Sequence, residues 1–130
     1  MSERRGTLLR RAAWEKPGES WRGHVEGLTL GTNVTVLFHA SEPGGGAPLH
    51  VHPYDEIFIV REGRVRYTVG DDTIDAKAGD IVLGPANVPH KFTNMGPGRL
   101  ETTDIHLSDR WIQQNLDDPG DRRDAENDPA

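Results

Sequence analysis

The sequence predicts an all-β fold, a sandwich or barrel of roughly seven or more short strands that ends in one short helix. Glycine and proline supply 15 and 9 of the 130 residues and separate short apolar segments instead of gathering in one block. Turns between short strands favour these residues, whereas helix interiors exclude them. The segments between the turns are rich in β-branched and aromatic residues or alternate polar with apolar, and both patterns are typical of strands.

The strand pattern recurs along the middle of the chain. Residues 33–39 (NVTVLFH) and 56–60 (EIFIV) are rich in β-branched and aromatic residues, which pack well on a pleated surface. Residues 64–69 (RVRYTV) alternate polar with apolar, which indicates a strand buried on one face only. We expect further strands over residues 80–83, 90–94 and 100–106.

Turns and one helix connect and end these strands. Residues 41–48 hold three consecutive glycines and two prolines and must form a loop. Gly70-Asp71-Asp72 predicts a hairpin turn, because glycine tolerates positive φ and aspartate bonds its own backbone. Ser108 is a good helix N-cap, and the helical pattern after it places on one face Trp111, Ile112 and Leu116.

The charge distribution divides the chain into three parts. Residues 1–22 form a polar segment with six basic and three acidic side chains. Residues 23–116 hold nearly all the apolar side chains and are expected to form one folded body, a barrel with its terminal helix. Residues 117–130 are acidic and poor in apolar side chains, so we expect a disordered tail.

Composition excludes several classes of protein. The sequence has no run of about 20 apolar residues, which a membrane-spanning helix would need. No apolar stretch follows the early arginines, as it would in a secretory signal. The chain has no cysteine, which rules out disulfides and thiolate metal sites. Its net charge of -6 argues against a nucleic-acid partner, because nonspecific binding needs a dense basic face. We therefore expect a cytoplasmic protein without membrane or nucleic-acid partners.

The side chains suited to chemistry are among the six histidines. His50 and His52 are two residues apart, so on a strand both rings point to the same face. Glu56 shares their parity but would lie about 13 Å beyond His52 on a straight strand. Pro53 favours a bend that would return Glu56 to the histidines. Imidazole and carboxylate ligands suit a divalent cation, although a His-x-His pair alone also occurs by chance.

The spacing of these residues resembles the two signature motifs of the cupin family. The first motif is matched, with every gap as the family has it, by Gly44, His50, His52, Glu56 and Gly63. The second is matched by Gly79, Pro85, His90 and Asn94. Asn87 stands where the second motif has glycine, and asparagine tolerates the left-handed conformation that such a turn requires. The resemblance covers roughly residues 32–107.

The resemblance implies an antiparallel jelly-roll barrel of roughly six to eight strands. It also implies one divalent transition metal ion (Fe, Mn, Ni or Zn), bound near the barrel mouth by His50, His52, Glu56 and His90. Three side chains share the inward-facing parity of these ligands and are candidates for lining a pocket: Phe58, Val60 and Phe92. The alternative is that they simply pack in the core. Tyr54, between two ligands, is a candidate for lining the mouth.

His106 is the candidate catalytic residue. Proton transfer needs a group whose pKa lies near neutrality, and the chain offers no cysteine for this role. Tyr54 has an ordinary pKa near 10. Asp104 shares the face of His106 on the last strand, and a neighbouring carboxylate would hold the tautomer of the ring and raise its pKa. If this strand turns that face outward, His106 is a surface or packing residue.

The expected function is that of a metal-dependent enzyme acting on a small oxygenated organic molecule, of the dioxygenase, isomerase or lyase type. The alternative is a non-catalytic module that binds or senses a metal ion or small ligand, because the fold does not select among these roles.

Three tryptophans lie outside the motifs. Trp14 and Trp21 in the N-terminal segment predict a homodimer to which this segment contributes. The alternative for Trp111 is that it packs the terminal helix onto its own barrel.

Overall fold

In the computed structural model, which describes residues 4–121 and 123, the chain forms two five-stranded antiparallel sheets and two one-turn helices. The elements follow one another as α1 (Arg11–Trp14), β1 (Gly23–Val25), α2 (Gly27–Leu30), β2 (Thr35–Ser41), β3 (His50–Val51), β4 (Glu56–Glu62), β5 (Arg64–Val69), β6 (Asp72–Lys77), β7 (Ile81–Gly84), β8 (His90–Asn94), β9 (Leu100–His106) and β10 (Gln114–Asn115).

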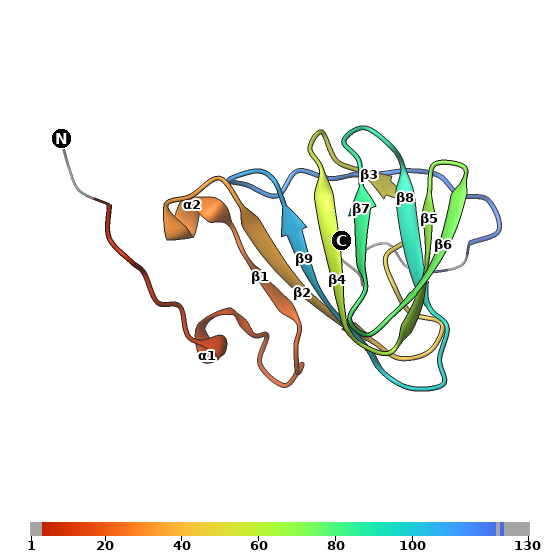
Figure 1. The fold of residues 1–130 in the computed structure, drawn as a ribbon, viewed down its shortest axis with the longest axis horizontal. Helices are drawn as coiled ribbons and strands as arrows, with labels where there is room; N and C mark the ends of the chain where they lie inside the picture. The colour runs from red at the N-terminus through yellow and green to blue at the C-terminus, as the bar shows by residue number, and fades with distance from the viewer. Residues whose placement is uncertain (1–3, 122, 124–130) are drawn as a thin grey trace.

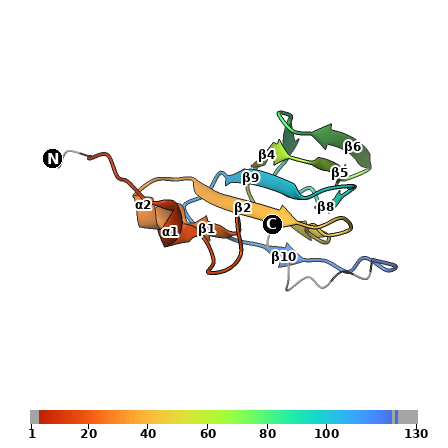
Figure 2. The ribbon, with the colours of Figure 1, turned by 90° about the horizontal axis from the view of Figure 1, so that it is seen from below.

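The first sheet has the strand order β1-β2-β9-β4-β7, and the second has the order β10-β3-β8-β5-β6. The two helices lie beside β1 and β2, at the end of the molecule far from β5 and β6 (Figure 1 and Figure 2). Neither helix exceeds four residues. Within the described residues, no helix has the length and hydropathy to cross a membrane.

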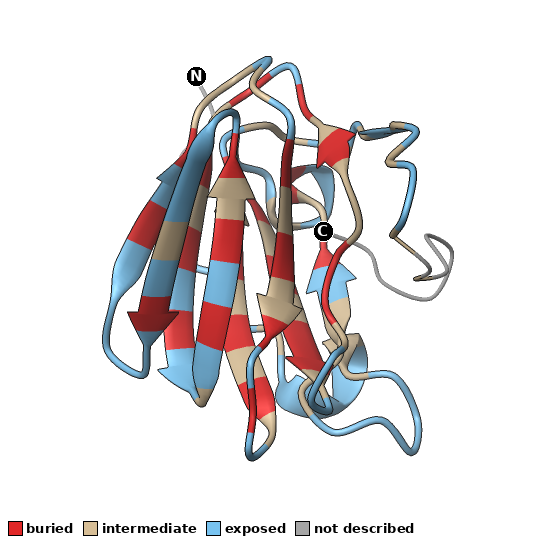
Figure 3. Cartoon of the chain, turned by 90° about the vertical axis from the view of Figure 1, so that its right-hand side faces the viewer, coloured by how far each residue is buried: buried red, intermediate tan, exposed pale blue. Residues whose placement is uncertain are grey.

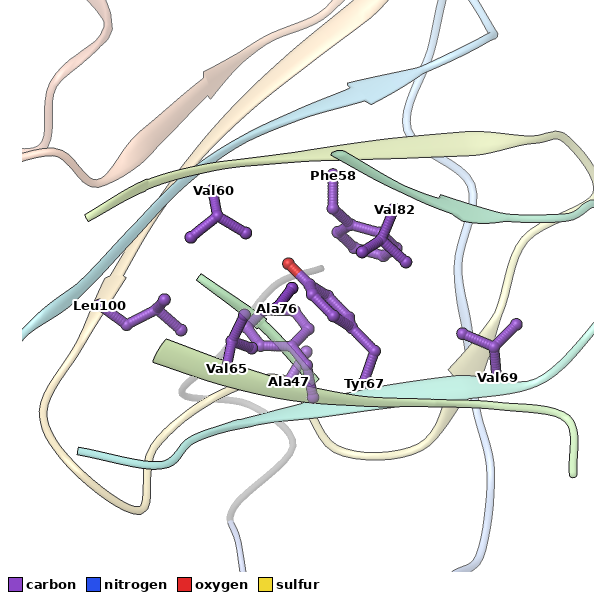
Figure 4. Packing of buried hydrophobic residues seen from close by; sticks show 10 residues of the cluster. Ala47, Phe58, Val60, Val65, Tyr67, Val69, Ala76, Val82 and Leu100 are labelled. Carbon is purple, nitrogen blue, oxygen red and sulfur yellow. The ribbon is translucent and has the colours of Figure 1, made fainter. Parts of the chain in front are cut away.

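The core lies between the two sheets. Buried and exposed residues alternate along the strands (Figure 3), as the period of two in a strand requires. Phe58 and Val60 of β4 point toward Val65 and Tyr67 of β5 from the facing sheet (Figure 4). Phe58 and Tyr67 are both fully buried, with ring centroids 4.6 Å apart. Apolar burial of this kind supplies most of the stability of such a fold.

The observed sheets do not close on each other, whereas the sequence led us to expect a closed jelly-roll barrel. Each sheet keeps two edge strands, β1 and β7 in the first and β10 and β6 in the second. The edge strands β1 and β10 have only three and two residues, which limits the exposed row of unpaired backbone groups.

In the described part of the chain no helix follows Ser108, so the predicted C-terminal helix is wrong. Residues after it run extended and add β10 to the edge of β3. The physical reason is that the backbone bonds elsewhere. The amide of Ile112 donates to the Tyr54 hydroxyl over 3.1 Å, and the amide of Leu116 donates to the Leu49 carbonyl over 3.0 Å. These bonds replace those that a helix would make within itself.

The N-terminal segment packs on its own chain. The ring of Trp14 stacks on Phe38 of β2 at 3.6 Å between centroids, and the ring of Trp21 meets Phe38 edge-on at 5.2 Å. Trp21 also donates its indole N–H to the Thr102 carbonyl, and the Arg61 guanidinium lies 3.7 Å above its ring. Both tryptophans are therefore engaged with the outer face of the first sheet, and both keep some exposed surface.

Part of the acidic C-terminal region also contacts the second sheet. Asp118 accepts a 2.6 Å charged hydrogen bond from Lys91 of β8. Arg123 pairs with Asp121 at 2.8 Å and donates to the Phe92 carbonyl. The remaining residues of the predicted disordered tail, 122 and 124–130, lie outside the described residues.

Phe58→Ala tests the core. Phe58 is 0% exposed, so the truncation leaves a cavity and is expected to lower the free energy of unfolding by about 3–5 kcal/mol. The matched control is Leu83→Ala on β7, where the side chain is 53% exposed and the expected loss is within about 0.5 kcal/mol. Urea unfolding followed by tryptophan fluorescence measures both values. Equal losses in the two variants would contradict this account of the core.

Candidate metal centre

Three histidines and one glutamate, with His106 beside them, meet where strands of both sheets begin or end. His50 of β3 and His90 of β8 are direct register partners in the second sheet. Glu56 opens β4 in the first sheet, where it faces His106, the last residue of β9. His52 follows β3, and its carbonyl accepts a 2.8 Å bond from the amide of Asn87. This bond fixes the bend before β4 that the sequence predicts at Pro53.

The ligand atoms of this group converge. The four residues each offer one nitrogen or oxygen atom, and these atoms all lie within 4.8 Å of one another: His50, His52, Glu56 and His90. The Oε1 atom of Glu56 lies 3.1 Å from Nε2 of His52 and 3.1 Å from Nε2 of His90. All four side chains are buried. The structure therefore brings together the set that the cupin resemblance implied.

Backbone carbonyls orient the three rings of this group. Nδ1 of His50 lies 2.6 Å from the Pro48 carbonyl, and Nδ1 of His90 lies 3.3 Å from the Val88 carbonyl. Nδ1 of His52 lies 2.7 Å from the carbonyl of Ile112. A carbonyl only accepts, so Nδ1 of His50 and Nδ1 of His52 carry the proton, and Nε2 of each neutral ring presents a lone pair to the centre. Nε2 of His90 is hydrogen-bonded to Oε1 of Glu56 over 3.1 Å, so this ring presents its lone pair only where an ion replaces that bond.

This donor set fits a divalent cation. Nε2 of His50 and Nε2 of His52 are buried without a hydrogen-bond partner, as are Oε2 of Glu56 and Nε2 of the neighbouring His106. A buried polar atom needs such a partner. The lone pair of His52 also faces an oxygen of Glu56, which is itself an acceptor. A cation between them would satisfy both atoms, and imidazole nitrogen with carboxylate oxygen suits Fe, Mn, Ni or Zn.

The protonation states favour the same conclusion. Burial and, second, the charge of His90 lower the pKa of His50 to about 3, so the ring is neutral near pH 7. Burial alone would raise the pKa of Glu56, but the charge of His106 and hydrogen bonds from the surrounding rings hold that pKa well below its usual range. These two groups can therefore bind a metal ion without first losing a proton.

His106 lies beside the group and does not belong to it. Its ring is fully buried and faces inward, with Nε2 3.0 Å from Oε2 of Glu56. Its Nδ1 lies 2.7 Å from the hydroxyl of Tyr54. Both ring nitrogens thus face groups other than Asp104, the partner that the sequence suggested for orienting this ring. Burial is the main cause that lowers the pKa of His106.

The candidate pocket residues have different surroundings. Phe58, Val60 and Phe92 all lie in the main apolar core, and the ring of Phe58 reaches the ring of His90 at 5.5 Å between centroids. Tyr54 is buried, with its ring stacked on His52 at 5.0 Å. Burial, as the largest cause, raises the pKa of Tyr54 to about 12, so its hydroxyl stays protonated.

A small pocket of about 220 Å³ opens beside His52, and its lining residues are Val51, His52, Pro53, Asn87, Ile112, Gln113 and Gln114. Asn87 has φ +63°, the left-handed conformation expected where the second motif has glycine. Sequence reasoning missed the contribution of residues 112–114, because no side-chain pattern marks a backbone carbonyl that will orient a histidine. A larger hollow of about 550 Å³, lined in part by Lys91 and Asp118, contains no residue of the metal group.

Comparison with known proteins gives one family model and several similar proteins. A family model described as "Cupin domain" matches residues 37–106. A "Polyketide synthase CurC" of Streptomyces cyaneus is 30% identical over 95 residues, which cover 72% of this chain and 61% of that protein. An uncharacterized protein of Streptomyces coelicolor is 37% identical over 60 residues, covering 46% of this chain and 57% of that protein. This chain thus spans less than two thirds of the length of either relative.

Solved structures share the fold. Oxalate decarboxylase from Bacillus subtilis superimposes with a TM-score of 0.68 and 24% identity, over 72% of this chain and 27% of that chain. Another oxalate decarboxylase structure, concerned with substrate binding, gives a TM-score of 0.70 over 78% of this chain and 30% of that one. A further Bacillus subtilis structure is described by its Mn(II) centers, with a TM-score of 0.68.

His52→Ala is expected to reduce metal occupancy sharply and leave the fold intact, because the apolar core is separate from the site. The matched control is His39→Ala, which removes another buried histidine of the interior that is no member of the metal group. Elemental analysis after loading with Mn²⁺ or Zn²⁺ measures occupancy, and circular dichroism checks the fold. Equal metal content in the His52→Ala variant and the parent would refute the assignment.

Proposed function

The chain belongs to the cupin family, and we propose that it is a metal-dependent enzyme that acts on a small oxygenated organic molecule. One observation carries the proposal: three imidazoles and one carboxylate, all buried, aim their ligand atoms at one point. Four protein ligands leave one or two positions of a five- or six-coordinate ion for a substrate.

The bound ion would be Fe, Mn, Ni or Zn, and it would polarise a carbonyl or carboxylate oxygen or, as iron, activate dioxygen. The protein residues do the remaining work. The carbonyls of Pro48, Val88 and Ile112 hold the rings in the tautomer that binds metal. The apolar core closes the site from below with Phe58, which keeps water from that side.

The pocket beside His52 supports a small polar substrate. Its volume of about 220 Å³ is below the range of pockets that take drug-sized ligands. Three amide side chains, those of Asn87, Gln113 and Gln114, lie along it, and His52 is the one ionisable residue of its lining. Amides both donate and accept hydrogen bonds, so they suit hydroxyl and carbonyl groups. The names of the compared proteins, a polyketide synthase and an oxalate decarboxylase, also involve oxygen-rich compounds.

The reaction type is proposed as that of a dioxygenase, an isomerase or a lyase. The second candidate is a non-catalytic module that binds a metal ion or a small ligand. The pocket beside His52 supports this candidate equally, because a protein can bind a small ligand in such a pocket without catalysing a reaction.

Metal content and turnover together test this proposal. We expect purified protein to carry a divalent ion, and removal with a chelator to abolish conversion of its substrate, with recovery when the ion is restored. Iron would favour oxygen chemistry, whereas Zn, Ni or Mn would favour an isomerase or lyase. A screen of hydroxy acids, keto acids and small phenols, read by mass spectrometry, measures conversion. Metal-dependent binding without conversion would support the second candidate, and a protein that takes up no metal would refute both.

We also propose a homodimer in the cytoplasm. The partly exposed surface of Trp14 and Trp21 on the first sheet supports a contribution from the N-terminal segment. Multi-angle light scattering at micromolar concentration is expected to give twice the 14.4 kDa of one chain. Replacing both tryptophans with serine should shift the mass toward the monomer. A parent mass near that of one chain would contradict the dimer.

A further inference from the structure

We infer that Tyr54 and His106 are positioning residues that hold one oxygen of Glu56, so that the carboxylate offers a bound metal ion only its other oxygen. This inference rests on the proposed metal site and adds a function for two buried residues that are not ligands. It assigns to His106 a role different from the proton transfer that the sequence suggested.

The two oxygens of Glu56 face different groups. Oε1 lies 3.1 Å from Nε2 of both His52 and His90, which are members of the metal group. Oε2 lies 3.0 Å from Nε2 of His106, which is not a member. Both atoms are fully buried, and the structure aligns neither of them as a hydrogen bond with any partner. The 3.0 Å contact between them is therefore the one that a small turn of the ring would complete.

The groups on either side of the ring indicate which nitrogen of His106 carries the proton. An ionised carboxylate can only accept, so Nε2 must be the donor toward Glu56. Nδ1 of the neutral ring is then an acceptor, and the Tyr54 hydroxyl 2.7 Å away is the donor to it. The opposite tautomer would set the lone pair of Nε2 against the carboxylate.

His106 therefore has the tautomer that the ligand histidines lack. His50 and His52 each turn Nδ1 toward a backbone carbonyl and keep the lone pair of Nε2 for a metal ion. Nδ1 of His90 also faces a carbonyl, and its Nε2 would exchange the bond to Oε1 of Glu56 for the ion. His106 turns Nδ1 toward a hydroxyl that donates to it, which makes Nε2 a donor and not a ligand. The group that faces Nδ1, a hydroxyl for His106 and a carbonyl for the metal-group histidines, thus distinguishes the positioning histidine from those that can bind a metal ion.

Tyr54 is itself held in place. The amide of Ile112 donates to its hydroxyl over 3.1 Å, and the carbonyl of Ile112, also at 3.1 Å, is a second acceptor for the one hydroxyl proton. That carbonyl already faces Nδ1 of His52 at 2.7 Å, whereas Nδ1 of His106 is the nearer acceptor for Tyr54, at 2.7 Å. We therefore assign the hydroxyl proton to His106. Its ring stacks on His52 with an interplanar angle of 13°. Glu56 and His106 are register partners on neighbouring strands, so the sheet sets their separation. The whole chain from the Ile112 amide to the carboxylate is fixed by backbone and packing.

The chemical consequence concerns the number of open positions at the ion. A carboxylate can bind a metal ion through one oxygen or through both. With Oε2 held by His106, Glu56 binds through Oε1 alone and leaves a position for water or substrate. Without that bond, Oε2 can turn toward the ion and occupy the position.

The test compares Mn²⁺ binding to the full chain with four substitutions. His106→Leu and Tyr54→Phe each remove a group between Ile112 and Oε2 of Glu56, and His106→Gln can restore a donor toward Oε2. The control, His39→Leu, removes a buried histidine of β2 that lies about four residues along the sheet from the position of His106. Two quantities are measured: the Mn²⁺ dissociation constant, and the water-proton relaxation per bound ion, which reports exchangeable water at the metal.

His106→Leu is expected to weaken Mn²⁺ binding by about 10–100-fold and to lower the relaxation per bound ion. Tyr54→Phe should change both quantities in the same direction and by less. His106→Gln should recover the relaxation, and His39→Leu should match the parent in both. Because relaxation is taken per bound ion, a merely structural role for His106 would not move it.

Parental relaxation per bound ion in both His106→Leu and Tyr54→Phe would overturn the inference and leave the metal site standing. Should His106→Leu fail to fold, Tyr54→Phe and His106→Gln decide the question alone. A parent chain that binds no Mn²⁺ or other divalent ion would refute the proposed function, and this inference with it.

Discussion

The burial of the Glu56 carboxylate is the constraint on which the site depends. Taking an ionised group out of water is costly unless charge and hydrogen bonds compensate it. Glu56 is fully buried, and every group that the structure places against its oxygens is an imidazole nitrogen. A cation held by His50, His52 and His90 would balance the negative charge. Nε2 of His106, 3.0 Å from the remaining oxygen, is the donor that we infer for it. The arrangement therefore makes chemical sense as a metal centre and is difficult to explain as an ordinary core.

The site and the core occupy different parts of the space between the sheets. The apolar cluster around Phe58 and Tyr67 stabilises the sandwich, while the polar group lies where β3, β4, β8 and β9 begin or end. Loops supply the carbonyls that orient the rings, including that of Ile112 in the extended C-terminal segment. This segment is consequently part of the site, and its backbone links the orientation of His52 to that of Tyr54.

The sequence was sufficient for whatever depends on spacing and parity. The grouping of His50, His52, Glu56 and His90 follows from motif spacing, and the alternation of residues 64–69 marks β5 correctly. The prediction of a C-terminal helix was wrong because the spacing of apolar side chains does not show that the backbone of this segment will bond to other groups, such as the hydroxyl of Tyr54. The prediction of a closed barrel was wrong because the pairing of strands at the sheet edges depends on segments that lie far apart in the sequence. The inward direction of His106 became clear only from its register with Glu56, which a single strand does not reveal.

The most direct test of the central claim is the position of the ion itself. Crystals of protein loaded with Mn²⁺ would be measured at a wavelength where manganese scatters anomalously. One peak is expected, at roughly 2.0–2.3 Å from Nε2 of His50, His52 and His90 and from a single oxygen of Glu56. A peak elsewhere in the molecule, or none between these four side chains at full Mn²⁺ loading, would contradict the central claim.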